Sequence, residues 1–382
     1  MERAPVLADE DFRRSRLQLA LFAAVLLSIA ASCDRPQPTT SSQEAQPNGS
    51  PSVLRLPTSK RVTAAAFSSD DKLLLVGYGF DGPVNHDLDP NLLDVWEVQG
   101  GKKLSAPGKW EARGSGQVHD VAFIPNGKLA LCAGIDKALT IWDVEDRKLL
   151  QALDQDALDI LCVAASADGK FAISGHGAAY GPRQLRVWDL GKRKALSRIR
   201  IGYANPSRLI ISPDGKLVLI IMKFLTPGEP NSLELRAVAD GALVRSFPLK
   251  DGWHGPATFT PDGKGILVTQ RGDCVLFDLM TGKETRRFRA RAFDVAFSLD
   301  GKRLLCLGRP STFYDAATGD PLSWRKVNWS DLLLFCFSAD GRFGFSAEAY
   351  STVGNDIAQP PHMSLSVWDA TTLKRLRTLR QD

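Results

Sequence analysis

Histidine and aspartate are the residues of this chain whose side chains could bind a metal ion or transfer a proton. All five histidines lie in or beside predicted loops, at His86, His119, His176, His254 and His362. Aspartates accompany two of them in sequence, Asp87 and Asp89 beside His86 and Asp356 before His362. Imidazole and carboxylate are common metal ligands, so a site shared by His86 and His362 is one interpretation. Ordinary solvent-exposed loop histidines are the other, and it is the one we prefer.

Aromatic and arginine side chains form a second group with binding chemistry, because Trp, Tyr and Arg dominate the hot spots of protein interfaces. Several of them lie in the connections between the repeated units described below, at Trp110, Tyr203, Trp253, Arg289, Arg291, Trp324 and Trp329. We take Tyr203, Trp253, Arg291 and Trp329 as the candidate partner-binding residues. The alternative interpretation is that these aromatics fill a central channel or pack between the units.

Sequence motifs of catalysis are lacking. The sequence contains no GxSxG elbow, no P-loop and no HExxH pair. Residues 77–82 match GxGxxG, but PVNHDLDP follows instead of the helix whose N-terminus would hold a pyrophosphate. We therefore assign no catalytic, cofactor-binding or metal-ligating residue, and we expect the chain not to be an enzyme.

A six-residue phrase recurs seven times and defines the elements that must position these side chains. The copies are FSSDDK at 67–72, FIPNGK at 123–128, ASADGK at 165–170, ISPDGK at 211–216, FTPDGK at 259–264, FSLDGK at 297–302 and FSADGR at 337–342. They are spaced by roughly 38 to 56 residues, as in a repeat architecture. Asp and Gly in each phrase have turn chemistry, and apolar runs flank it. Each unit therefore predicts four short antiparallel strands, which we name a, b, c and d.

Strand c carries a second repeated signal, an aromatic residue followed by a carboxylate. It reads Trp96-Glu97, Trp142-Asp143, Trp188-Asp189, Phe277-Asp278, Tyr314-Asp315 and Trp368-Asp369, while the fourth unit departs with LELRAVADG at 233–241. With the SPDGK-type turns, this pattern resembles the WD-repeat family over residues 53–382, in the looser variety found in bacteria. The Gly-His dipeptide that opens a typical WD unit is absent at the start of these units, so the family's buried network on that histidine is not carried over.

The resemblance implies an all-β fold, a seven-bladed β-propeller of four-stranded antiparallel blades. Two segments compete to close the ring, residues 53–56 and the outer strand expected at 373–379, and the sequence leaves both open. We expect no helix of consequence after residue 52.

Loop lengths distinguish the two faces of such a ring. The a–b turns are uniform, whereas b–c insertions are predicted at 77–91, 175–183, 224–232 and 350–363. All four insertions fall on one face, which we call the loop-rich face, and insertions on one face of a repeat protein commonly mark the binding face.

The N-terminal segment predicts export. Residues 17–32 are uncharged and largely apolar, follow Arg13, Arg14 and Arg16, and lead through small residues into Cys33. This resembles a bacterial lipoprotein signal, with residues 1–32 as signal peptide, lipidation at Cys33, and residues 33–52 as a flexible tether rich in Pro, Ser, Thr and Gln. An uncleaved membrane anchor and simple secretion are the alternatives. In each case the propeller lies outside the cytoplasm. A lipoprotein or an uncleaved anchor would hold it on a membrane, on the periplasmic or cell-surface side.

The remaining cysteines and the charge favour ordinary packing. Cys132, Cys162, Cys274, Cys306 and Cys336 lie in predicted strands without CxxC spacing, so we interpret them as buried small hydrophobic residues. The net charge of +5 is modest, and basic runs at 191–194 and 286–291 are placed on outer strands, where charge protects sheet edges. Nucleic acid is therefore not expected as a partner.

Two functions follow as hypotheses. The resemblance implies a non-catalytic interaction scaffold, tethered to a membrane outside the cytoplasm, which binds a protein or peptide partner as a monomeric propeller. The alternative is a propeller enzyme, a hydrolase or lyase with its site at the channel mouth. A convergent acid–base or metal constellation would distinguish the two.

Overall fold

The structure is a computed structural model of the 382-residue chain. It describes residues 60–80, 92–104, 117–125, 128–134, 138–146, 148–155, 158–177, 183–202, 204–223, 232–248, 256–270, 272–290, 292–298, 300–308, 311–325, 332–338, 342–350, 362–369, 372 and 374–379. The chain divides into two compact units, Met1–Pro51 and Ser52–Asp382, and all described strands belong to the second. No described segment is a helix long and apolar enough to cross a membrane.

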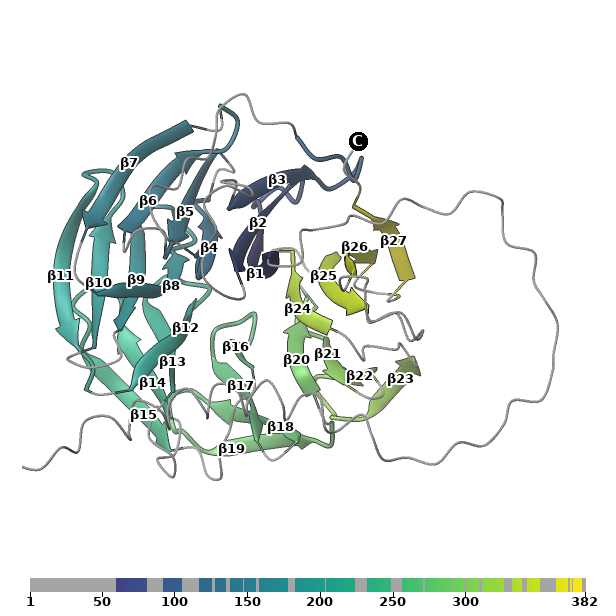
Figure 1. The fold of residues 1–382 in the computed structure, drawn as a ribbon. Helices are drawn as coiled ribbons and strands as arrows, with labels where there is room; N and C mark the ends of the chain where they lie inside the picture. Colours follow the sequence, from purple (N-terminus) through teal and green to yellow (C-terminus); the bar gives the residue numbers. More distant parts are fainter. Residues whose placement is uncertain are drawn as a thin grey trace, which may run out of the picture. The chain divides into compact units, whose positions relative to one another are not determined.

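The second unit is a seven-bladed β-propeller, as predicted (Figure 1). Blade 1 contains β1 (Lys60–Phe67), β2 (Leu73–Phe80) and β3 (Leu93–Glu97). Blade 2 contains β4 (Asp120–Phe123), β5 (Leu129–Ala133), β6 (Ala138–Asp143) and β7 (Lys148–Gln155). Blade 3 contains β8 (Asp159–Ala165), β9 (Phe171–Gly177), β10 (Gln184–Asp189) and β11 (Lys194–Arg200). Blades 4 and 5 contain β12 (Asn205–Ile211), β13 (Leu217–Lys223), β14 (Ser232–Ala237) and β15 (Leu243–Pro248); and β16 (Ala257–Phe259), β17 (Gly265–Gln270), β18 (Asp273–Asp278) and β19 (Glu284–Phe288). Blades 6 and 7 contain β20 (Ala292–Phe297), β21 (Arg303–Gly308), β22 (Ser311–Asp315) and β23 (Pro321–Arg325); and β24 (Leu332–Phe337), β25 (Phe343–Tyr350), β26 (His362–Asp369) and β27 (Lys374–Thr378).

Within each blade, sequence neighbours pair antiparallel. In blade 1 a bridge from Lys103 to Trp96 and the bond from the Leu104 N–H to the Val95 carbonyl continue the sheet beyond β3, where a fourth strand belongs. The first strands of the blades adjoin one another around the centre, β1 beside β4 and β24, β4 beside β8, and β8 beside β12. These first strands therefore surround the central axis of the ring, and we call the space that they enclose the central channel.

Except in blade 2, which has Ile124 at this position, the second residue of the repeated phrase builds the a–b turn through its hydroxyl group. In blade 4 the Ser212 hydroxyl donates to the Asp214 carboxylate (2.6 Å) and accepts from the Leu217 N–H (2.9 Å). The same carboxylate accepts the Lys216 N–H, and Gly215 turns the chain at φ 72°. The same hydroxyl–carboxylate bond recurs in blades 1, 3, 5 and 6. The repeat is therefore a hydrogen-bonded turn that starts strand b at a defined register.

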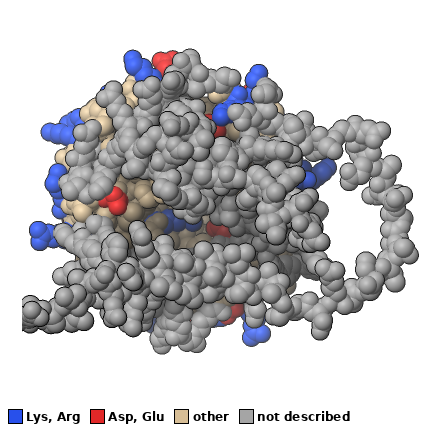
Figure 2. Space-filling view, viewed as in Figure 1, with Lys and Arg blue, Asp and Glu red and all other residues tan. Residues whose placement is uncertain are grey.

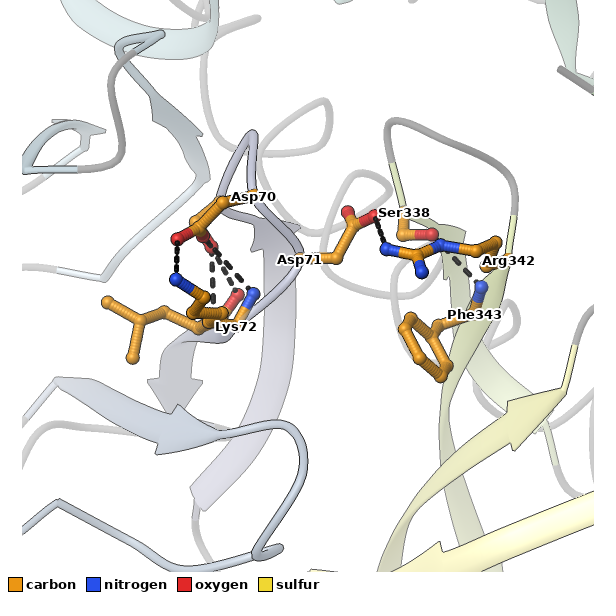
Figure 3. A network of polar contacts seen from close by, with 8 residues as sticks. Asp70, Asp71, Lys72, Ser338, Arg342 and Phe343 are labelled. Carbon is orange, nitrogen blue, oxygen red and sulfur yellow. Dashed lines mark hydrogen bonds and ion pairs between the residues drawn. The ribbon is translucent and has the colours of Figure 1, made fainter.

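Blade 1 departs from the phrase where the ring closes. Asp71 occupies the glycine position at φ 56°, a conformation that costs a non-glycine residue of order 1 kcal/mol. Its carboxylate points across to blade 7 and lies 3.7 Å from the Arg342 guanidinium (Figure 3). Arg342 itself replaces the lysine of the phrase, so the two departures from the repeat meet as an ion pair between the first and last blades.

Apolar layers between adjacent blades form the core. One cluster joins blade 1 to blade 7 through Tyr78 and Trp96 on one side and Phe345, Leu365 and Leu379 on the other. Equivalent clusters join blades 1 and 2, 2 and 3, 3 and 4, 4 and 5, and 5 and 6. β27 is the outer strand of blade 7, so the C-terminal segment fills the place that the sequence left open, whereas residues 53–56 lie outside the described residues.

The structure shortens all four predicted insertions, since Ser232 begins β14, Tyr350 ends β25 and His362 begins β26, and two further changes affect blades 1 and 3. Residues 77–80 continue β2 and residues 175–177 continue β9, so both strands run further than expected before their loops begin. In both segments glycines alternate along the strand, Gly77 and Gly79 in the first and Gly175 and Gly177 in the second. A Cβ atom on Gly175 would lie 2.5 Å from the Cys162 Sγ atom, so the alternation reflects close packing rather than a loop.

Candidate binding site at the central channel

The four predicted partner-binding residues, Tyr203, Trp253, Arg291 and Trp329, all lie outside the described residues, as does Cys33. Their positions in the chain are nevertheless informative. They precede the first strands of blades 4 to 7, which are β12, β16, β20 and β24. The described parts of those strands show which chemistry follows these four residues in the sequence.

Charged residues occupy one equivalent position on alternate first strands. This position lies three residues before the first residue of each repeated phrase, and it holds Asp120 in blade 2, Arg208 in blade 4 and Asp294 in blade 6. In blades 1, 3, 5 and 7 the same position holds Ala64, Cys162, Pro256 and Leu334. Aligning the seven phrases would have shown this alternation, and the sequence reasoning missed it.

Asp120 links two blades along the channel wall. One of its carboxylate oxygens accepts the N–H of Val163 on β8 of the next blade (3.0 Å), and the other accepts the N–H of Val121 (2.9 Å). Removal from water raises the pKa of Asp120 to about 6, although these hydrogen bonds and the positive charge of Arg208 favour the ionised form. Asp120 is therefore a carboxyl group that titrates near neutral pH.

Asp294 repeats part of this arrangement on the opposite part of the ring. Its carboxylate accepts the N–H of Val295 (2.9 Å). Burial raises its pKa, and the Arg208 charge again opposes the shift. Burial and the nearby Asp294 carboxylate also raise the pKa of the Cys336 thiol to about 12, so this thiol is protonated and unreactive at neutral pH.

Arg208 is the exposed cation between these two carboxyl groups. Its side chain is exposed. From blade 4, its positive charge lowers the pKa of Asp120 in blade 2 and of Asp294 in blade 6, each two blades away. Figure 2 shows basic and acidic side chains, blue and red, among tan atoms in the middle of the view. A guanidinium group presents five donors in a planar fork that matches a carboxylate, so Arg208 can bind an acidic or carbonyl group that enters the channel.

A serine–histidine pair in blade 3 first resembles nucleophilic machinery. The Ser174 hydroxyl lies 2.7 Å from the His176 Nε2 atom, but it also accepts the Trp188 indole N–H (2.8 Å). Ser174 and His176 are fully buried. Because no substrate can reach a fully buried hydroxyl that already accepts an indole N–H, this is a structural network rather than a nucleophile.

The same network corrects the prediction for His176, which we expected in an exposed loop. The residue lies on β9, with its ring in the interior, because β9 extends past the predicted strand end. Burial lowers its pKa to about 4, with a contribution from the Arg198 charge, so the ring is neutral at physiological pH. Indole–hydroxyl bonds recur at Trp142 with Thr140 and at Trp368 with Ser346.

The remaining histidines provide no metal centre in the described part of the chain. His119 is exposed, as predicted for a loop histidine. The proposed pair cannot be assembled from the described residues, because His86 lies outside them and His362 is described only as the start of β26. Among the described residues, no group of three His, Cys, Asp or Glu side chains could hold a metal ion.

Stability should depend on pH through two groups with opposite signs. His176 stays neutral in the folded chain down to about pH 4 but protonates near 6.5 when unfolded. Its contribution to the free energy of unfolding is therefore lost as pH falls from 6.5 to 4. Asp120 keeps its proton up to about pH 6 when folded but loses it near 3.8 when unfolded, so its contribution is lost as pH rises from 3.8 to 6.

Urea unfolding of two variants between pH 4 and 6.5 would separate these contributions. Relative to the wild type, we expect His176→Gln to remove a rise of the unfolding free energy with pH, and Asp120→Asn to remove a fall. Curves that stay parallel to the wild type for both variants would contradict the assignment.

Comparisons with known proteins support a WD-repeat propeller. Residues 108–143 match the family model "WD domain, G-beta repeat". The chain is 24% identical over 250 residues to transducin beta-like protein 3 of Rattus norvegicus, covering 62% of this chain and 29% of that protein. It is 28% identical over 94 residues to small ribosomal subunit protein RACK1 of Drosophila melanogaster, covering 24% of this chain and 27% of that protein. The chain thus spans less than a third of each relative.

A solved structure gives the same fold. "Kuenenia stuttgartiensis Hydrazine Synthase" superimposes with a TM-score of 0.59, covering 80% of this chain and 96% of the solved chain at 16% identity. At this level of identity the likeness concerns the fold alone, because one propeller scaffold serves many unrelated functions.

Proposed function

We propose that this chain is a non-catalytic interaction module that binds a protein or peptide on its loop-rich face, with Arg208 as an anchor at the channel. The exposed guanidinium of Arg208, flanked by Asp120 and Asp294 on channel-lining strands, is the observation that carries this proposal. WD-repeat propellers generally bind protein partners, and the similarity to such proteins supports the assignment.

Charges of both signs suit a peptide partner. The guanidinium can hold a carboxylate or main-chain carbonyl of the partner, while the two carboxyl groups can accept N–H donors from the same segment. Tyr203, Trp253, Arg291 and Trp329 would extend this site, because they precede the strands that end in the channel. The Ser174–His176 contact is fully buried and so cannot act on a substrate, and we favour binding over the hydrolase or lyase alternative.

Affinity measurements on a defined set of variants test the proposed binding site. Once a partner has been identified by crosslinking, Arg208→Ala, Tyr203→Ala, Trp253→Ala, Arg291→Ala and Trp329→Ala should each weaken binding by about 2 kcal/mol or more, roughly thirtyfold, as truncated hot spots do. The matched controls lie in the uniform turns, where the backbone N–H groups of Lys216 and Lys264 bond within the turn and leave the side chains exposed. Lys216→Ala and Lys264→Ala should cost less than about 0.5 kcal/mol.

Melting temperatures of the same variants distinguish binding from packing. If the tryptophan variants lose stability while the folded protein binds with unchanged affinity, the aromatics fill the ring and the proposed site is wrong. If Arg208→Ala alone keeps full affinity, the anchor is wrong while the face itself remains.

We further propose that the module is held outside the cytoplasm by lipid on Cys33. The uncharged run before Cys33 and the tether after it support this address. Cys33→Ala should abolish incorporation of a labelled fatty acid. It should also release the protein from membranes or block its processing, because the acyl chains on Cys33 would be the anchor and stable anchoring needs more than one chain. A Cys33→Ala protein that stays membrane-bound at full precursor mass would instead indicate an uncleaved anchor.

A further inference from the structure

Cys274 and Cys306 bring two thiols together across the interface between blades 5 and 6. Cys274 lies on β18 and Cys306 on β21, and their sulfur atoms are 3.5 Å apart. Both residues are buried in the apolar cluster that joins the two blades, with Phe288 and Tyr314 beside them. Among the five cysteines that the structure describes, this is the one sulfur–sulfur contact.

We propose that Cys274 and Cys306 are the site of a disulfide that links blade 5 to blade 6. At 3.5 Å the sulfurs are in van der Waals contact, and a disulfide of about 2.05 Å requires them to approach by about 1.5 Å. The two sulfur atoms already meet between neighbouring sheets, so the remaining approach is short.

The chemistry needs a disulfide-bearing oxidant such as oxidised glutathione. The thiolate of one cysteine attacks the donor disulfide and releases one thiol, forming a mixed disulfide. The second cysteine then attacks its partner's sulfur and releases the second thiol, so two protons and two electrons leave the pair. The donor disulfide is reduced to two thiols, and the balance is complete.

Burial determines when this reaction occurs. The folded pair lies in a closed apolar layer, and the pKa of the Cys306 thiol is raised by its contact with Cys274 and by burial. A thiolate is the attacking species, so exchange requires that blade 6 has not yet packed against blade 5, or that the two separate again. The bond therefore forms during folding in an oxidising compartment, which is where the proposed export would place the chain.

The other cysteines serve as internal controls. Cys162 is buried, and its sulfur contacts the Pro206 carbonyl oxygen (3.6 Å) instead of another sulfur. Cys132 is equally buried on β5, where the Thr140 hydroxyl donates to its carbonyl oxygen (3.2 Å). Neither residue should pair in the folded protein.

The test uses the full chain, unfolded in urea and returned to buffer that contains reduced and oxidised glutathione, with refolding checked by circular dichroism. Free thiols are then alkylated, and the protein is digested and analysed by mass spectrometry without reduction. We expect a cross-linked peptide pair containing Cys274 and Cys306, with Cys132 and Cys162 alkylated. The oxidised protein should also melt a few degrees above the reduced one, on the order of the gain that such links give.

Variants complete the experiment. Cys162→Ala should retain the cross-linked pair and the difference in melting temperature, whereas Cys274→Ala and Cys306→Ala should lose both. Alkylation of both Cys274 and Cys306 in the refolded wild type would overturn the proposal, and so would pairing of either with another cysteine. The peptide map of the wild type decides the question even if a variant fails to fold. None of these outcomes depends on partner binding, so they leave the proposed function separately testable.

Discussion

Trp188→Ala should destabilise the propeller by about 3–5 kcal/mol, the range for removing a fully packed tryptophan or phenylalanine. Trp188 is 2% exposed and lies in the cluster between blades 2 and 3. Its removal leaves a cavity there, and it also takes the donor away from the Ser174 hydroxyl. The measurement is the midpoint of urea unfolding. A shift of the midpoint with an unchanged dependence of the unfolding free energy on urea concentration reports a change of stability alone.

Two further variants show which part of the loss is packing. Trp188→Phe keeps an aromatic ring but lacks the N–H group that bonds Ser174, so it should cost less, about 1–2 kcal/mol. Leu243→Ala truncates a side chain on the outer strand β15 that is 52% exposed, and it should change stability by under about 0.5 kcal/mol. A loss for Trp188→Ala no larger than that of Leu243→Ala would show that the blade 2–blade 3 layer is not the stabilising core described here.

Gly134→Ala should cost at least about 2 kcal/mol, because a side chain there would require a change of backbone. Gly134 follows β5 at φ 113°, and a Cβ atom would lie 2.4 Å from the Gln117 carbonyl oxygen and 2.7 Å from the His119 nitrogen. These are main-chain atoms of the segment that enters β4, where the His119 N–H bonds the Ala133 carbonyl (2.9 Å). The substitution should therefore disturb the start of β4, where Asp120 lies.

Gly215→Ala is the matched control for Gly134→Ala. Gly215 also has a positive φ, 72°, but no heavy atom lies within 4 Å of a Cβ atom placed there. It should show the conformational cost alone, about 1 kcal/mol. If the two variants lose the same free energy of unfolding, the close approach of main-chain atoms to Gly134 does not contribute to stability.

The channel residues show what position in the repeat can and cannot predict. Asp120, Arg208 and Asp294 share one offset from the phrase, so their equivalence is contained in the sequence. Their common environment is not, because Arg208 acts on both aspartates only when blades 2, 4 and 6 face one channel. The bond from Val163 to Asp120 likewise joins strands 43 residues apart and requires neighbouring blades.

The prediction for His176 failed for a related reason. Its surroundings in sequence, GHG, have the composition of a loop, and local turn chemistry favours one. The glycines instead let Cys162 and Pro206 approach the strand closely, which is a contact between blades 3 and 4 that no local pattern reveals. Burial of the ring, its neutral form and its bond to Ser174 follow from that packing.

The sequence by itself determined the number of blades, the order of strands and the a–b turns, because the bonds in each phrase join residues at most five positions apart, as between Ser212 and Leu217. Such local bonds can form within any one copy of the repeat. The tertiary structure decided what lies between copies, the ion pair of Asp71 with Arg342 and the contact of Cys274 with Cys306. It also decided that β27 is the outer strand of blade 7. The contact of Cys274 with Cys306 needs only two neighbouring blades to pack, whereas the ion pair depends on ring closure, which brings the first and last repeats together.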